Sequence, residues 1–292
     1  MSERGGSSIV VLGDTQRTTL VERLLLGREQ NERARRALLE KLVREERPAF
    51  VIHLGDLVSC GASAREWQYF DRLVAPLAAH GIRIRPVLGN HDYWGPAALA
   101  LRYARRRFPE LAPNTFGALH HGPLGLIWLD SNLSGGAAAQ QLRWFESTLA
   151  GYERDPELRG VLAFAHHPPF SNARGHARTG RALTLLLPPF FAAAKTLALL
   201  SGHVHGYERF ERRGKTFIVS GGAGGPRATY HTGTGAPHPP AYLTADGRAR
   251  AFHYLVIELM AEQLCFEVKC LELGAACPGG LLETFCLPLA VR

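Results

Sequence analysis

Five short apolar runs in this sequence each end in side chains that can bind a metal ion or move a proton. The run that ends at Leu88 is followed by Gly89, Asn90, His91 and Asp92, which present an amide and an imidazole side by side. Alone, this segment is better explained as a turn, because Gly, Asn and Asp all favour turns. Its recurrence favours a functional site, since ligands bind beyond the carboxyl ends of strands in open α/β sheets. The five strand ends carry Asp14 with Gln16, Asp56, Asn90 with His91, His166, and His203 with His205.

Predicted helices alternate with strands in the first half of the chain, and strands pair with strands later. The early and central strands are expected at 8–12, 49–54, 84–88, 115–120, 125–129, 161–165, 196–200 and 216–220. Helices are expected at 17–46, 63–80, 96–107 and 137–150. A hairpin at 252–259 and 264–272 and a short strand at 284–287 complete the order. This order predicts an α/β protein with a mixed sheet or two stacked sheets.

The chain is expected to form a single domain over residues 1–292, because neither an internal repeat nor a break in composition divides it. Hydrophobic residues make up 46% and charged residues 21% of the 292 residues, which is typical of a globular protein with a substantial core. The best candidate for a membrane span, 182–200, is interrupted by Pro188, Pro189 and Lys195. No membrane partner is therefore expected.

The net charge of +8 suits an anionic partner, either a phosphate compound or a nucleic acid. Arginines concentrate at 33–36 and 102–107, both within predicted helices. Solvated helix faces explain these clusters better than a nucleic-acid surface does. A nucleic-acid partner is therefore not expected, and the oligomeric state is left open.

The cysteines and the first residues of the chain both bear on its compartment. The five cysteines are odd in number and form no CxxC pair, which favours a reducing compartment over a disulfide framework. A zinc cluster of the last four is disfavoured by their irregular spacing. Residues 1–6 lead almost directly into the first strand and do not resemble a secretory signal. A cytoplasmic protein is expected.

The side chains at the strand ends match what two neighbouring divalent ions require. Two ions about 3.5–4 Å apart need a bridging carboxylate and oxygen and nitrogen ligands around each ion. The set offers two carboxylates, amide oxygens and imidazoles but no thiolate, which suits Mn, Fe or Zn in a catalytic rather than a structural site. His203 and His205 would face opposite ways on a straight strand, so they are expected in a loop.

The motifs Gly13-Asp14-x-Gln16, Gly55-Asp56, Gly89-Asn90-His91-Asp92, His166 and Gly202-His203-x-His205 resemble, in this order, the five blocks of the calcineurin-like metallophosphoesterase superfamily. The resemblance covers about residues 8–225. Within the superfamily, His166-His167-Pro168-Pro169, Gly206-Tyr207-Glu208-Arg209 and the loop 221–226 are most similar to the purple-acid-phosphatase-like branch. The C-terminal β-hairpin region, about 250–292, fits that branch too. The resemblance implies two mixed β-sheets packed as a sandwich with helices outside, in four αββα layers.

The resemblance also implies a role for each residue at the strand ends. One metal ion would be bound by Asp14 and His205, with Asp56 as the bridge to the second ion. Asn90, His166 and His203 would bind the second ion. A hydroxide held between the ions would attack phosphorus in line, and His91 would protonate the leaving oxygen. The implied activity is dimetal-dependent hydrolysis of a small-molecule phosphomonoester or phosphodiester.

Two positions depart from the pattern of the superfamily. Gln16 stands where a metal-binding histidine is common, and its amide oxygen is a weaker ligand, so the sequence leaves open whether Gln16 binds the ion. Ser59 stands where many relatives carry an aspartate that orients the acid histidine. True purple enzymes have a tyrosine there, so a purple chromophore is not expected. These departures motivate one alternative, a catalytically weak metal-binding scaffold. The other alternative is a metal-dependent nuclease.

Candidate substrate contacts follow the fourth strand end. His167 is assigned either to the substrate or to the shape of its loop. Arg174, His176 and Arg178 lie in a loop just beyond it and could clamp a phosphate, as arginine often does. His53, within a buried strand, is expected to be a core histidine or to support a ligand rather than to bind metal.

Overall fold

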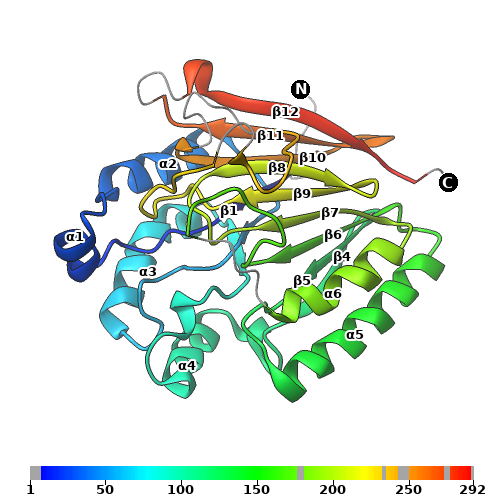
Figure 1. The fold of residues 1–292 in the computed structure, drawn as a ribbon, viewed down its shortest axis with the longest axis horizontal. Helices are drawn as coiled ribbons and strands as arrows, with labels where there is room; N and C mark the ends of the chain where they lie inside the picture. Colours follow the sequence, from blue (N-terminus) through cyan, green and yellow to red (C-terminus); the bar gives the residue numbers. More distant parts are fainter. Residues whose placement is uncertain (1–7, 176–180, 232–234, 243–249, 273–276, 291–292) are drawn as a thin grey trace.

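The molecule consists of two six-stranded mixed β-sheets packed face to face, with helices on the outside (Figure 1). The structure, a computed structural model, describes residues 8–175, 181–231, 235–242, 250–272 and 277–290. The expected α/β sandwich is confirmed.

One sheet contains the first three and the last three strands of the chain. Its order is β12-β11-β10-β1-β2-β3, in which β1, β2 and β3 are parallel and the other strands antiparallel. The strands are β1 (Ser8–Leu12), β2 (Phe50–His53), β3 (Arg83–Pro86), β10 (His253–Leu259), β11 (Gln263–Cys270) and β12 (Leu281–Pro288). The predicted hairpin, formed by β10 and β11, therefore lies in this sheet, where β10 pairs with β1.

The second sheet has the order β4-β5-β6-β7-β9-β8, with parallel pairing from β5 through β6 and β7 to β9. Its antiparallel edge strands are β4 and β8. The strands are β4 (Gly117–His121), β5 (Leu124–Trp128), β6 (Gly160–Ala165), β7 (Thr196–Ser201), β8 (Tyr207–Arg212) and β9 (Lys215–Ser220).

Three apolar layers hold the sandwich together. The central layer lies between the sheets, where residues such as Ile52 and Phe164 are buried together. A second layer packs the β6 sheet against α5 and α6, and a third packs the β1 sheet against α2 and α3. The helices are α1 (Leu20–Leu26), α2 (Glu32–Glu45), α3 (Ala64–Ala79), α4 (Ala97–Arg107), α5 (Gly135–Arg154) and α6 (Arg181–Ala192), with short 3₁₀ turns at His91–Tyr93, Pro109–Leu111 and Pro278–Gly280.

The first predicted helix is wrong as a single element, because 17–46 contains two helices. Gly27 adopts a left-handed backbone with φ of 60° and ends α1, as glycine commonly does after a helix. One strand and one α-helix were not predicted. Strand β8 is an edge strand of charged and aromatic residues, and α6 contains Pro188 and Pro189 within its helical span.

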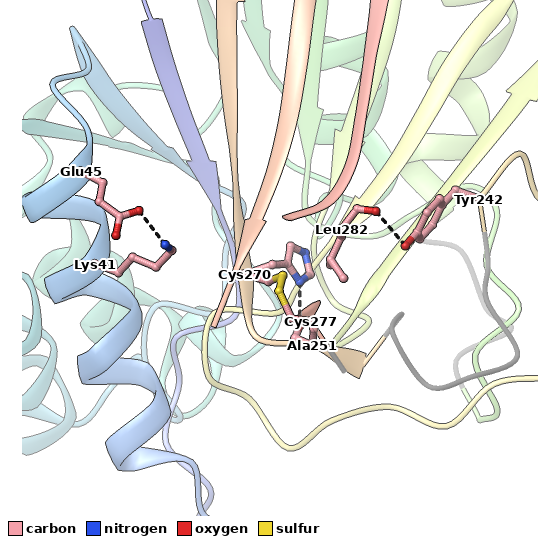
Figure 2. Close-up of a disulfide and its surroundings, with 8 residues drawn as sticks. Lys41, Glu45, Tyr242, Ala251, Cys270, Cys277 and Leu282 are labelled. Atoms are coloured by element: carbon pink, nitrogen blue, oxygen red, sulfur yellow. Dashed lines mark hydrogen bonds and ion pairs between the residues drawn. A yellow bond between two sulfur atoms is a disulfide. The ribbon is translucent and has the colours of Figure 1, made fainter. Parts of the chain in front are cut away.

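The cysteine prediction is also wrong, because four of the five cysteines form disulfides. Cys265 and Cys286 face each other across β11 and β12 and are bonded. Cys270, at the end of β11, is bonded to Cys277 beside Ala251 (Figure 2). Spacing alone could not reveal these pairs, because strand register brings them together. Such bonds are typical of oxidising compartments, so the cysteine argument for a cytoplasmic protein loses its basis.

None of the helices in the described part of the chain has both the length and the apolar character needed to cross a membrane.

Candidate metal centre

The predicted strand ends meet where the two sheets pack together. Strands β1, β2 and β3 of one sheet and β6 and β7 of the other are each followed by one member of the set. The carboxyl ends of parallel strands share an edge, and the sandwich brings both edges to one place. Asp14, Asp56 and His203 have left-handed backbones, with φ of 65°, 53° and 68°. Such backbones cost free energy and concentrate at functional sites.

The first group of side chains, here called the Asp14 cluster, consists of Asp14, Gln16, Asp56 and His205, all of them buried. The His205 Nε2 atom lies 3.4 Å from Asp14 Oδ1 and 3.1 Å from Gln16 Nε2. Gln16 Nε2 is also 3.1 Å from Asp56 Oδ2. Atoms that bind one ion at about 2.1 Å and at right angles lie about 3 Å apart, so these spacings fit a shared divalent ion.

Gln16 provides a further test of this fit. Its Oε1 atom is buried and has no hydrogen-bond partner. The oxygen and nitrogen of an amide exchange places on a half-turn of the group, and their assignment follows from the surrounding partners. The half-turn places Oε1 3.1 Å from both Asp56 Oδ2 and His205 Nε2, where it can serve a cation. A bound ion would give Oε1 a partner, and the amide nitrogen would then take the position where Oε1 now has none.

The second group, here called the His166 cluster, consists of Asn90, His166 and His203, with Asp56 shared. The His166 Nε2 atom lies 3.1 Å from Asn90 Oδ1 and 3.2 Å from His203 Nδ1. Asn90 Oδ1 is in turn 3.0 Å from His203 Nδ1. Asp56 Oδ1 lies 3.4 Å from His166 Nε2, whereas Oδ2 of the same carboxylate faces Gln16. The Asp56 carboxylate therefore contacts both clusters, through one oxygen each.

Backbone carbonyls orient two of the imidazoles. His166 donates from Nδ1 to Leu54 O at 2.8 Å, and His205 donates from Nδ1 to Pro226 O at 2.7 Å. Because a carbonyl only accepts, both rings carry a proton on Nδ1, which makes Nε2 the nitrogen that can bind a metal. The His203 amide donates to both carboxylate oxygens of Asp14 at 3.0 Å, which links the two clusters.

The two buried carboxylates, Asp14 and Asp56, require positive charge nearby to stay ionised. Burial raises the pKa of Asp14 against the opposing effect of His205. Burial also works against ionisation of Asp56, but His166 outweighs it and holds the pKa of that carboxyl below its usual range. Burial alone would lower the pKa of His166, whereas Asp56 raises it to about 9. A protonated His166 thus balances the carboxylates when no metal is present, a role that a divalent cation would take over.

His91 lies beside both clusters and is oriented without an aspartate. Its Nδ1 donates to the backbone oxygen of Ser59 at 3.0 Å, and its ring centroid is 3.7 Å from that of Trp94. Its amide donates to Asp56 Oδ1 at 2.9 Å. The Ser59 hydroxyl donates instead to Glu66. The Ser59 carbonyl and the neighbouring Trp94 ring, tilted by 34° to the imidazole, therefore orient His91 in place of an aspartate.

His167 lies closer to the His166 cluster than the sequence suggested. Its ring centroid is 4.5 Å from that of His203, and its Nδ1 is 2.7 Å from Ser131 Oγ. Burial, followed by the charge of His166, lowers the pKa of His167 to about 3, so its ring is neutral. With His166 and His203 it forms a group whose nitrogens could share an ion.

Asp130 and Ser131 were missed by the sequence reasoning, although they follow β5 as the other polar ends follow their strands. Ser131 contacts His167, and Asp130 Oδ2 accepts a hydrogen bond from Tyr93 at 2.5 Å. The pattern of an apolar run followed by polar side chains could have found them.

The remaining substrate candidates fall into two classes. Arg174 donates to Tyr230 O at 3.3 Å and lines a cleft of about 560 Å³ that also reaches His205. His176 and Arg178 lie outside the described residues. His53 is buried against Thr15, at 2.9 Å from its Oγ1, and burial lowers the pKa of this histidine to about 3. As expected, His53 lies in the core, where its ring contacts Thr15 and accepts a hydrogen bond from the Gly55 amide.

Residues 7–207 match the family model described as calcineurin-like phosphoesterase. The chain belongs to the calcineurin-like phosphoesterase family. The prediction of a metal-dependent phosphoesterase is thereby confirmed at the level of the family.

Known proteins similar to this chain include phosphatases and a phosphodiesterase. The Fe(3+)-Zn(2+) purple acid phosphatase 12 of Arabidopsis thaliana is 33% identical over 46% of this chain and 28% of its own length. Glycerophosphodiester phosphodiesterase GpdQ of Enterobacter lignolyticus is 30% identical over 42% of this chain and 43% of its own. The purple acid phosphatase PPD1 from yellow lupin seeds shares the fold, with a TM-score of 0.70 and 16% identity over 97% of this chain and 53% of that chain. The chain thus spans less than half of each of these two curated relatives.

Proposed function

We propose that this protein hydrolyses phosphate esters with two divalent metal ions, one in the Asp14 cluster and one in the His166 cluster. The observation that carries the proposal is the position of Asp56, whose two carboxylate oxygens face the two clusters separately. A buried carboxylate so placed is the bridging ligand that a two-metal site requires. The donor set of oxygens and imidazoles favours Mn, Fe or Zn.

The residues divide the catalytic work among them. When bound, two divalent ions supply Lewis acidity and a nucleophile near neutral pH, which phosphoester hydrolysis requires. Asp14, Gln16 and His205 would hold one ion, and Asn90, His166 and His203 the other. His91 would donate a proton to the leaving oxygen, since Ser59 O fixes its Nδ1 proton and leaves Nε2 for exchange.

The substrate is proposed to be a small-molecule phosphate ester, and both ester classes stay open. The similarity to a purple acid phosphatase favours a monoester, and that to a glycerophosphodiester phosphodiesterase favours a diester. Residues 1–292 are proposed to act as one domain. The two disulfides favour an oxidising compartment over the cytoplasm as its location.

Hydrolysis of a nitrophenyl phosphate monoester and of the matching bis-ester tests the proposal. The protein is stripped of metal with a chelator and assayed before and after addition of Mn²⁺. We expect turnover that depends on added metal, and the preferred ester identifies the substrate class. Turnover that persists without metal contradicts the proposal, as does the absence of turnover on both esters when two ions are bound. The second result would favour the scaffold alternative.

A further inference from the structure

Helix α1 turns an apolar face to solvent. None of its seven residues is buried. Leu20, Val21, Leu24 and Leu25 are exposed by 60%, 62%, 66% and 78%. Helical spacing puts these four side chains on one side, because residues four apart lie one above the other. Leu26 of the same helix is also exposed, by 62%. The remaining large exposed apolar residues of the described chain are far apart in the sequence: Trp94, Leu185, Met260 and Leu281.

The polar side chains of α1 bond to residues at the two ends of the helix. Thr19 and Glu22 form a reciprocal cap at the start of the helix. Glu22 also pairs with Arg28 at 3.1 Å, just beyond Gly27. These bonds stabilise the helix and its C-terminal turn, and Figure 1 shows α1 at the margin of the molecule, outside both sheets. A contiguous exposed apolar patch of this kind marks an interaction surface.

A basic cleft joins this helix to the metal centre. The cleft of about 560 Å³ begins at Leu26 and Arg28 and reaches His205 of the Asp14 cluster. Arg174, Arg227 and Arg250 also line it, with Glu29 as the acidic residue of the lining. Glu29 pairs with Arg227 at 2.7 Å and with Arg250 at 3.7 Å, which leaves the cleft positively charged overall. Anionic groups that lie beside α1 are thus drawn toward His205.

We propose that α1 docks on an anionic phospholipid bilayer and that the metal centre acts on lipid phosphate esters in that surface. Apolar side chains on one face of a helix, with arginines beside them, are the features that hold helices in the membrane interface. The four outward side chains would enter the boundary of the acyl chains. The arginines of the cleft would face the phosphate headgroups. The substrate part of this inference rests on the proposed function, whereas the docking part does not.

Flotation with vesicles tests the docking. One set of vesicles is pure phosphatidylcholine, and the other adds an anionic lipid. That lipid is phosphatidic acid if the nitrophenyl monoester is preferred, or phosphatidylglycerol if the bis-ester is preferred. The test variant is Leu24→Gln with Leu25→Gln, which keeps a good helix former at both positions. The matched control is Leu185→Gln with Met260→Gln, which removes two exposed apolar side chains elsewhere.

The unaltered protein and the control are expected to float with the anionic vesicles and to hydrolyse their lipid. The α1 variant is expected to lose flotation and at least about tenfold in lipid hydrolysis, with unchanged turnover of the soluble nitrophenyl ester. Equal flotation of the α1 variant and the control overturns the proposal. So does a failure of the unaltered protein to float, including the case in which α1 instead joins two copies of the chain and its variant dissociates a dimer. Turnover of the nitrophenyl ester without vesicle binding would refute the docking alone and leave the proposed function standing.

Discussion

The two halves of the metal centre differ in both chemistry and burial. The Asp14 cluster presents two carboxylates, an amide and one imidazole, all of them buried. The His166 cluster presents two imidazoles and an amide, with Asn90 and His203 partly open to solvent, and shares only the Asp56 carboxylate. Oxygen-rich sets suit harder cations than imidazole-rich sets do. The two halves are therefore expected to differ in metal preference and in accessibility to substrate.

The largest effect is expected where the two halves join. Asp56→Asn removes the charge that faces both clusters, so we expect it to release both ions and lower kcat/KM by about 10⁴-fold. Metal content by elemental analysis and turnover of a nitrophenyl ester measure the two effects. Asp71→Asn, at an exposed position on α3, serves as the control and should retain both ions. Retention of one ion per chain by Asp56→Asn would argue against a bridging role.

His91 tests whether proton donation can be separated from metal binding. In His91→Asn the amide can still donate to Ser59 O, but no group remains to exchange a proton. We expect both ions to be kept and turnover to fall by about 10³-fold, most for esters with poor leaving groups. A series of substituted phenyl phosphates measures this dependence. His120→Asn, at an exposed histidine on β4, is the control. A uniform loss across the series would remove His91 from the role of acid.

The pH dependence of metal uptake should show the deprotonation of His166. With its pKa at about 9 in the metal-free protein, His166 carries a proton at neutral pH and must lose it to bind an ion. Affinity should therefore rise with pH up to about 9 and level off above it, with about one proton released from His166 near neutral pH. Calorimetry in buffers of different ionisation enthalpy measures the release. His166→Asn should abolish this share of it, and an unchanged release would contradict the assignment.

The smallest effect is expected from Gln16, which we propose as the weakest ligand of the Asp14 cluster. Gln16→His replaces an amide oxygen by an imidazole, so we expect about tenfold tighter binding of one ion and little change at the other. A chelator competition with Zn²⁺ measures both sites. The control is Gln140→His, at an exposed position on α5. The neighbouring Gln141 is unsuitable, because its amide is buried against the backbone of Asp130. Equal tightening of both ions would show that Gln16 does not belong to one half.

The sequence predicted which polar side chains lie together better than it predicted the elements around them. Asp14, Asp56, Asn90, His166 and His203 follow parallel strands, and the register of such strands brings their ends together whatever the exact bounds. The group that orients His91 could not be predicted, because Ser59 acts through its backbone, which every residue has.

The elements that were missed depend on contacts between distant segments. Cys265 and Cys286 pair because β11 and β12 lie in register, and residue spacing does not encode that register. The sequence of β8 is typical of a polar loop, and its strand conformation depends on pairing with β9. The apolar spacing of 17–46 predicted one continuous helix across Gly27, because a single glycine is tolerated inside many helices.

The central claim is that two ions, one in each half, act together. The most direct test adds Mn²⁺ stepwise to metal-free protein and follows bound metal and turnover of a nitrophenyl ester in the same samples. We predict saturation at two ions per chain, with turnover that appears mainly with the second. Full turnover at one ion per chain, or saturation at one, would contradict the account.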